Sequence, residues 1–178
     1  MDAATDFLSR PEGLGSDRTS TQHMQDIAVV LDYLRGRFPG LPIWLVGTSR
    51  GVISAANAAA VLTGPAAPDG IVLTSSLTQP AVGNPESLQN VALEDIGVPS
   101  LVVAHRDDTC PFTPPDDAKA LFHTLRKGHP RSGLRFFVGG FPPLDAPCDA
   151  LAAHGFFGIE ARVVEAIGRF ILSIGDAL

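Results

Sequence analysis

One stretch of the chain, residues 43–61, constrains the fold most strongly. A short apolar run at residues 43–46 has the length and composition of a buried strand. It leads directly into Gly-Thr-Ser-Arg-Gly at residues 47–51, which fits the pattern G-x-S-x-G, and an Ala-rich run at residues 52–61 then favours a helix. In a tight turn between a strand and a helix, the central Ser49 is held in a strained backbone conformation with its hydroxyl exposed.

Two glycines of this turn, Gly47 and Gly51, are expected because a side chain at either position would collide across it. The alternative interpretation is an ordinary strand-to-helix turn that contains a serine by chance. The strand before the motif and the helix after it favour a nucleophile elbow, a turn that presents a serine as an attacking group.

The remainder of the chain alternates short apolar runs with helical patterns. A first helix is predicted from Thr19 as its N-cap, with Gln22 completing a capping box and an inward face that includes Val30. Further segments are expected as strands at 71–74, 101–104 and 134–138, as helices opening at Pro114 and at Gly158 or Glu160, and as a helical turn within 87–95. This alternation predicts an α/β fold of three layers, with helices on both faces of a mainly parallel sheet. We expect residues 1–178 to form one domain, with residues 1–18 irregular.

Composition excludes several classes of partner. The net charge of −6 and the absence of a basic run argue against nucleic acid. No apolar run approaches the roughly 20 residues that cross a bilayer, so no membrane span is expected. The first residues lack the pattern of a secretory signal, which makes the cytoplasm the default expectation. The two cysteines, Cys110 and Cys148, fit no zinc pattern, and no metal site is predicted.

A serine hydroxyl attacks efficiently only when a base accepts its proton and a carboxylate orients that base. Asp107 and Asp108 follow the strand expected at 101–104, at the edge of a parallel sheet where ligand sites form. His154 lies in the loop that follows the last expected strand. Ordinary loop roles remain open for these residues, as solvated aspartates that cap a turn or as a histidine held by local hydrogen bonds.

Four further histidines are weaker candidates for the base. They are His23 in a first helical turn, His105 beside the two aspartates, and His123 and His129 near the end of a helix.

The serine, acid and histidine occur in the order that resembles the α/β-hydrolase superfamily. The stretch at residues 154–160, His-Gly-Phe-Phe-Gly-Ile-Glu, and the paired cysteines are similar to a subgroup of small bacterial members. The resemblance implies a serine hydrolase for a small carboxylic ester or related acyl substrate, without a cofactor. It favours Asp108 over Asp107 as the acid and the backbone N–H of Arg50 as an oxyanion donor. It also suggests a Cys110–Cys148 disulfide, with two reduced thiols as the alternative in a cytoplasmic protein.

The resemblance covers the chain from about Thr19 onward, and the family's earlier strands have no counterpart, so an N-terminally truncated fold is expected. A second oxyanion donor, which the family takes from a loop in that part, has no visible source. The strand at residues 43–46 would then form an exposed edge, open to a second copy of the chain or to a complementing partner. A missing upstream signal would place the protein in the periplasm or outside the cell and would favour the disulfide.

Two alternative functions remain open at this stage. The first is a weakly active or inactive remnant that serves as a binding or assembly module. The second is an acyl transferase or a metal-free haloperoxidase that uses the same three residues.

Overall fold

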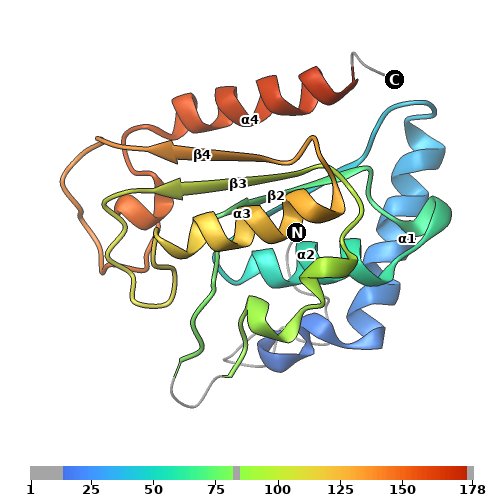
Figure 1. Cartoon of the computed structure of the whole chain (residues 1–178), viewed down its shortest axis with the longest axis horizontal. Helices are drawn as coiled ribbons and strands as arrows, with labels where there is room; N and C mark the ends of the chain where they lie inside the picture. Colours follow the sequence, from blue (N-terminus) through green and yellow to red (C-terminus); the bar gives the residue numbers. More distant parts are fainter. Residues whose placement is uncertain (1–13, 82–84, 176–178) are drawn as a thin grey trace.

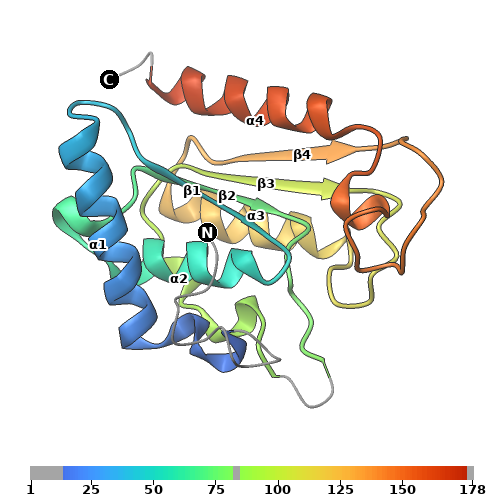
Figure 2. The same cartoon turned by 180° about the vertical axis from the view of Figure 1, so that it is seen from behind.

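The computed structural model describes residues 14–81 and 85–175, and its centre is a sheet of four parallel strands. The strands are β1 (Trp44–Thr48), β2 (Gly70–Thr74), β3 (Ser100–His105) and β4 (Gly133–Phe137), and they neighbour one another in chain order. Helices on both faces complete the three layers (Figures 1 and 2). The predicted three-layer α/β architecture with a parallel sheet is therefore confirmed.

Within the described ranges, four α-helices cover this sheet. α2 (Gly51–Val61) and α3 (Asp117–Gly128) pack on one face, with α1 (Thr21–Arg37) beside α2, whereas α4 (Glu160–Gly175) covers the opposite face (Figure 1). Short 3₁₀ turns lie at Gly15–Thr19, Gly64–Ala66, Leu88–Asn90, Leu93–Asp95 and Ala153–Gly155. No helix in the described ranges has the length and apolar content to cross a bilayer.

Alternation along the strands divides the core into two halves. Ile71 and Leu73 of β2 face the α2 and α3 side, and Val72 between them faces α4. Successive strand residues point to opposite faces of a sheet, so a central strand buried on both faces is apolar throughout. All five residues of β2 are buried for this reason.

The N-terminal expectations need correction at three places. Ser20, not Thr19, is the N-cap of α1, and its hydroxyl accepts a hydrogen bond from the backbone N–H of His23 at 3.1 Å. Thr19 ends the 3₁₀ turn Gly15–Thr19, so the last part of the segment predicted to be irregular is ordered. Residues 1–13 of that segment lie outside the described residues. Val30, predicted to point inward, is exposed because the buried side of α1 is narrower than its apolar pattern.

The helix predicted to open at Pro114 instead begins at Asp117. The backbone N–H groups of Asp117 and Ala118 donate to the carbonyls of the two preceding prolines, so these form the turn before the helix. The last helix begins at Glu160, one of the two starts expected.

β1 is an edge strand in the described part of the sheet, as the exposed-edge prediction anticipated. The residues that flank β1 bond toward the β2 side. The Ile43 carbonyl accepts from the backbone N–H of Asp69 at 2.8 Å, and Ser49 donates its N–H to the Thr74 carbonyl at 3.0 Å. Backbone direction alternates along a strand, so Trp44, Val46 and Thr48 direct their N–H and C=O groups away from β2. Val46, at the centre of β1, is 57% exposed.

Candidate active site

The G-x-S-x-G motif forms the turn between β1 and α2, and Ser49 stands at its apex with a φ of 53°. This left-handed conformation is strained for a residue with a side chain and is typical of functional turns. Gly47 permits the turn because a Cβ there would run into the backbone carbonyl of Gly51. The expectation for Gly51 itself was wrong, since a Cβ at that position meets open space.

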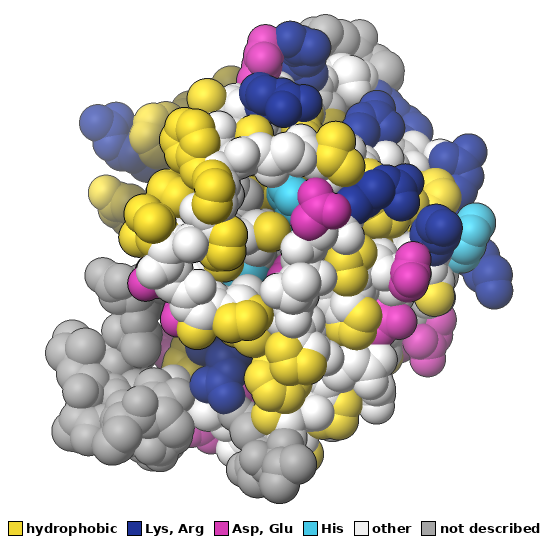
Figure 3. All heavy atoms as spheres, turned by 90° about the vertical axis from the view of Figure 1, so that its left-hand side faces the viewer, with side chains coloured by type: hydrophobic (Ala, Val, Ile, Leu, Met, Phe, Trp, Pro, Cys, Tyr) yellow, Lys and Arg dark blue, Asp and Glu magenta, His cyan; other side chains and the backbone are white. Residues whose placement is uncertain are grey.

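The carboxyl ends of the strands form one face of the molecule, shown in Figure 3. On this side, two loops distant in sequence bring a carboxylate and an imidazole together. His154 Nδ1 lies 3.0 Å from Asp108 Oδ2, and both side chains are almost completely buried. The structure thus pairs Asp108, and not Asp107, with the histidine predicted to be the base.

Two further groups hold the acid. Cys110 donates its backbone N–H to Asp108 Oδ1 at 2.9 Å, and the Thr113 hydroxyl donates to Asp108 Oδ2 at 2.9 Å. The same Thr113 oxygen lies 3.2 Å from His154 Nδ1, so it is shared between acid and base. Both carboxylate oxygens therefore have partners, which fixes the plane of the carboxylate.

These contacts assign the proton of the imidazole. A carboxylate only accepts hydrogen bonds, so His154 donates through Nδ1 and its Nε2 carries the lone pair. Among the described residues, His154 Nε2 is buried and has no hydrogen-bond partner. It is thus a proton acceptor with a free lone pair, the atom required of a general base.

The end of β2 connects the serine to the histidine. Ser49 donates its backbone N–H to the Thr74 carbonyl at 3.0 Å, and the hydroxyl of the next residue, Ser75, donates to the His154 carbonyl at 2.7 Å. Ser75 is buried and has a φ of 43°, a second left-handed residue beside the first. The backbone of Ser49 is therefore anchored to Thr74, and that of His154 to the next residue, Ser75.

Sequence reasoning missed Thr113 and Ser75. The only available signal was position, because Thr113 lies five residues after the acid and Ser75 directly follows a strand. A hydroxyl side chain at such a place is common, so its partner becomes visible only in three dimensions.

The other candidates lie elsewhere. His105 is buried, with Nε2 at 2.8 Å from the Gly139 carbonyl and Nδ1 accepting from the Asp107 N–H, so both ring nitrogens have structural partners. The Asp107 side chain is exposed. His23 bonds to Ser54 of α2, and His123 is exposed on α3.

Arg50, proposed from sequence as an oxyanion donor, is the N-cap residue of α2. Backbone N–H groups at a helix start lack intrahelical partners and favour negative charge. Burial raises the pKa of Glu86, and the positive charges of Arg18 and Arg50 offset this increase only in part. The charged side chain of Arg50 therefore lies within the electrostatic range of a buried carboxyl group.

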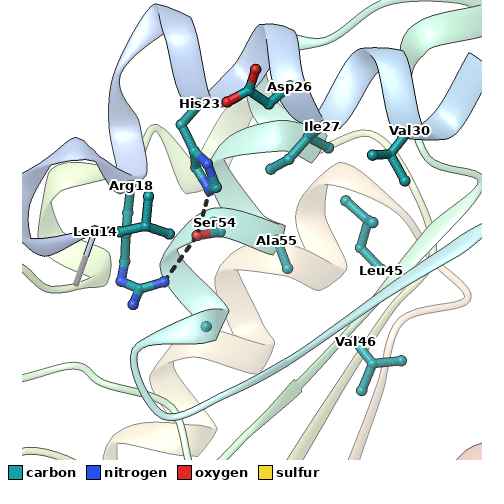
Figure 4. A pocket seen from close by; sticks show the side chains of 11 residues that line it. Leu14, Arg18, His23, Asp26, Ile27, Val30, Leu45, Val46, Ser54 and Ala55 are labelled. Carbon is teal, nitrogen blue, oxygen red and sulfur yellow. Dashed lines mark hydrogen bonds between the residues drawn. The ribbon is translucent and has the colours of Figure 1, made fainter. Parts of the chain in front are cut away.

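A cavity of about 250 Å³ lies beside the elbow helix, between α1, α2 and β1 (Figure 4). Its walls are mostly apolar, and at one end His23 and Arg18 converge on the hydroxyl of Ser54, at 2.9 and 3.4 Å. Burial and the charge of Arg18 lower the pKa of His23. These bonds join the start of α1 to the helix that follows Ser49.

Cys110 and Cys148 form a disulfide with Cα atoms 4.7 Å apart. It joins the loop that carries Asp108 to the loop that leads to His154. The disulfide suggested from the sequence is thus confirmed, and the alternative of reduced thiols is not what the structure shows.

No model of a known protein family matches this sequence, and no curated protein matches it. Function is therefore inferred from the arrangement of the residues themselves.

Proposed function

We propose that this protein is a serine hydrolase of the α/β-hydrolase type that cleaves a small carboxylic ester or related acyl substrate. The observation that carries the proposal is the buried Asp108–His154 pair. Among the described residues His154 Nε2 has no hydrogen-bond partner, and it lies on the side of the sheet where Ser49 follows β1 in a strained turn. A nucleophile, a base and an orienting acid are the parts that acyl transfer to a serine requires.

In the proposed reaction, Ser49 Oγ attacks the substrate carbonyl and its proton passes to His154 Nε2. The N–H of Arg50 stabilises the oxyanion, and Asp108 stabilises the positive charge on the imidazole. The tetrahedral intermediate collapses, and His154 returns the proton to the departing alcohol. Water then attacks the acyl-enzyme with the same histidine as base, which releases the carboxylic acid and regenerates Ser49. No cofactor is required in this scheme.

The contact between Ser49 Oγ and His154 Nε2 has to form or tighten when substrate binds. The described structure contains no hydrogen bond between them, although catalytic contacts are often long in unliganded enzymes. The backbone of Ser49 is bonded to β2 and that of His154 to Ser75. Rotation about side-chain bonds therefore brings the two atoms together with the least rearrangement.

A second candidate function follows from the elbow side of the site. Within the described residues, β1 has a neighbouring strand on one side only and an exposed Val46, and the sequence has no visible source of a second oxyanion donor. Both features favour a weakly active or inactive hydrolase remnant that binds a partner, either a second copy or another chain, along β1. Loss of one oxyanion donor lowers turnover by about 10²–10³-fold.

The disulfide supports an oxidising compartment, such as the periplasm or the cell exterior, over the cytoplasmic default. A thiol count on protein isolated from its native compartment tests this point directly. Two free thiols would favour the cytoplasm.

A fluorophosphonate probe, which reacts with activated serines, tests the main proposal. We expect the wild type to be labelled and both Ser49→Ala and His154→Ala to lose labelling. Ser173→Ala and His123→Ala, at exposed positions of α4 and α3, are matched controls and should be labelled like the wild type. A folded wild type that stays unlabelled would favour the remnant, and labelling that survives Ser49→Ala would exclude Ser49 as the nucleophile.

A further inference from the structure

The loop between β4 and the 3₁₀ turn at His154, residues 138–152, exposes several large apolar side chains. Phe141 is 65% and Leu144 is 70% exposed, and Val138, Leu151 and three prolines of the same loop are exposed too. We call residues 138–151 the apolar loop. Single exposed apolar residues are normal, whereas contiguous apolar patches mark interaction sites.

The apolar loop is held in place by several bonds. The backbone N–H of Phe141 donates to the Phe157 carbonyl at 3.0 Å, and the two rings meet edge to face with centroids 5.5 Å apart. The N–H of Leu144 donates to the Leu151 carbonyl at 2.8 Å. The disulfide fixes Cys148 to the acid loop. The backbone of the loop is therefore held at several points, with Phe141 and Leu144 exposed to solvent.

The apolar loop lies beside the candidate active site. It leads directly to His154, and its disulfide partner Cys110 is two residues beyond Asp108. The view onto the carboxyl ends of the strands shows hydrophobic side chains gathered on the same face as the histidines (Figure 3). A surface that contacted this loop would lie next to the reacting groups.

Charge restricts what that surface is. Residues 138–153 contain two carboxylates, Asp145 and Asp149, and neither lysine nor arginine. An anionic surface, such as a membrane rich in acidic lipids, attracts basic residues and would repel this loop. An uncharged apolar surface meets no such repulsion, and it removes the exposed side chains from water.

From these observations we propose that the apolar loop docks on the uncharged surface of a water-insoluble ester aggregate and delivers its molecules to the site. This inference rests on the proposed function and specifies its substrate class as esters presented at an interface. The relevant substrates are esters of apolar acids or alcohols that exceed their solubility.

Adsorption tests the docking step without catalysis. Ser49→Ala protein is mixed with triolein droplets coated with phosphatidylcholine, and the bound fraction is measured after flotation. Adding Phe141→Ser and Leu144→Ser is expected to weaken adsorption at least about tenfold, because two large apolar side chains no longer leave water. Val29→Ser with Tyr33→Ser is the matched control.

That control removes two side chains of α1 with similar exposure, 69% and 67%, and should leave adsorption unchanged. Droplets that carry phosphatidylglycerol should bind less protein. No adsorption, equal adsorption by the loop variant, or preference for the anionic droplets would each overturn the proposal.

Turnover across the solubility limit of tributyrin tests the consequence for catalysis. We expect the rate of the catalytically intact protein to rise steeply once droplets appear. The Phe141→Ser/Leu144→Ser variant should lose most of that rise, and the α1 control should keep it. A rate that saturates before droplets form would overturn the inference. Absence of turnover in every state, with adsorption intact, would overturn the proposed hydrolase function and leave the docking surface supported.

Discussion

The two halves of the proposed triad are supported in different ways. Asp108 and His154 are buried, hydrogen-bonded to each other and joined through their loops by a disulfide. Ser49 directly follows an edge strand whose central residue, Val46, is mostly exposed. The base half, which is Asp108 with His154, is thus complete within the described chain. The elbow half, which is Ser49 and its turn, depends on one strained conformation and its bonds to β2. Local sequence can specify a nucleophile's conformation without the sheet around it being closed.

The largest effect is expected in the base half. Asp108→Asn should lower kcat about 10⁴-fold, because an amide can donate to Nδ1 and leave the proton on the wrong nitrogen. The exposed Asp107 provides a matched control, and Asp107→Asn should retain nearly wild-type turnover. Ester hydrolysis at saturating substrate measures both. An equal loss in the two variants would break the distinction drawn between them.

Removal of the disulfide tests how much this covalent link between the loops of the base half stabilises the fold. Closing a loop over a sequence separation of 38 residues is expected to stabilise the fold by about 4 kcal/mol on the chain-entropy estimate. Cys110→Ser with Cys148→Ser should therefore lower the free energy of unfolding by up to that amount, measured by urea titration. Reductant should shift the wild type in the same direction and leave the double variant unaffected.

The elbow half can be tested with its two glycines. Gly47→Ala should lower stability by about 1–3 kcal/mol, because the new Cβ would overlap the Gly51 carbonyl and the turn would have to move. Gly51→Ala should be neutral or stabilising by up to about 1 kcal/mol, since it has space and lies in a helix. Urea midpoints measure both. Equal losses would show that the turn is less tightly constrained than its geometry indicates.

The smallest effect concerns pH. Burial and Arg18 lower the pKa of His23 in the folded state below its ordinary 6.5, so the unfolded chain binds more protons in the window beneath that value. This contribution to stability is present above pH 6.5 and is lost as pH falls through the folded pKa. His23→Gln should therefore reduce the acid-side slope of stability against pH.

His129, whose pKa is also lowered by burial, provides the comparison for His23. The variant with both histidines replaced should have the shallowest slope in urea midpoints measured across this range. A slope unchanged by His23→Gln would mean that other groups control it.

Much of this arrangement was predictable from sequence because its signals are local. The elbow needs only a strand, five residues and a helix, all adjacent in the chain. The meeting of Asp108 and His154 follows from parallel strands, since loops at their carboxyl ends share one edge of the sheet. The choice of Asp108 over Asp107 came from a family resemblance and agrees with the contact to His154.

The remaining features depend on tertiary contacts that sequence does not reveal. The hydroxyls of Thr113 and Ser75 contact His154, which lies 41 and 79 residues away from them. The exposure of Val30 depends on how α1 sits against α2 and β1, which its apolar pattern does not specify. The space around Gly51 is likewise a property of the folded turn and not of the motif.

The strands neighbour one another in the order in which they occur along the chain, and this has a consequence for synthesis on the ribosome. None of the four described strands inserts between two earlier ones, so each pairing can form soon after its second member emerges. β1 and β2, with α2 between them, can fold before β4 has been translated. The nascent chain would then form the turn around Ser49 before His154 has been translated. The disulfide can close only after residue 148 appears, which makes the base the last part of the site to be secured.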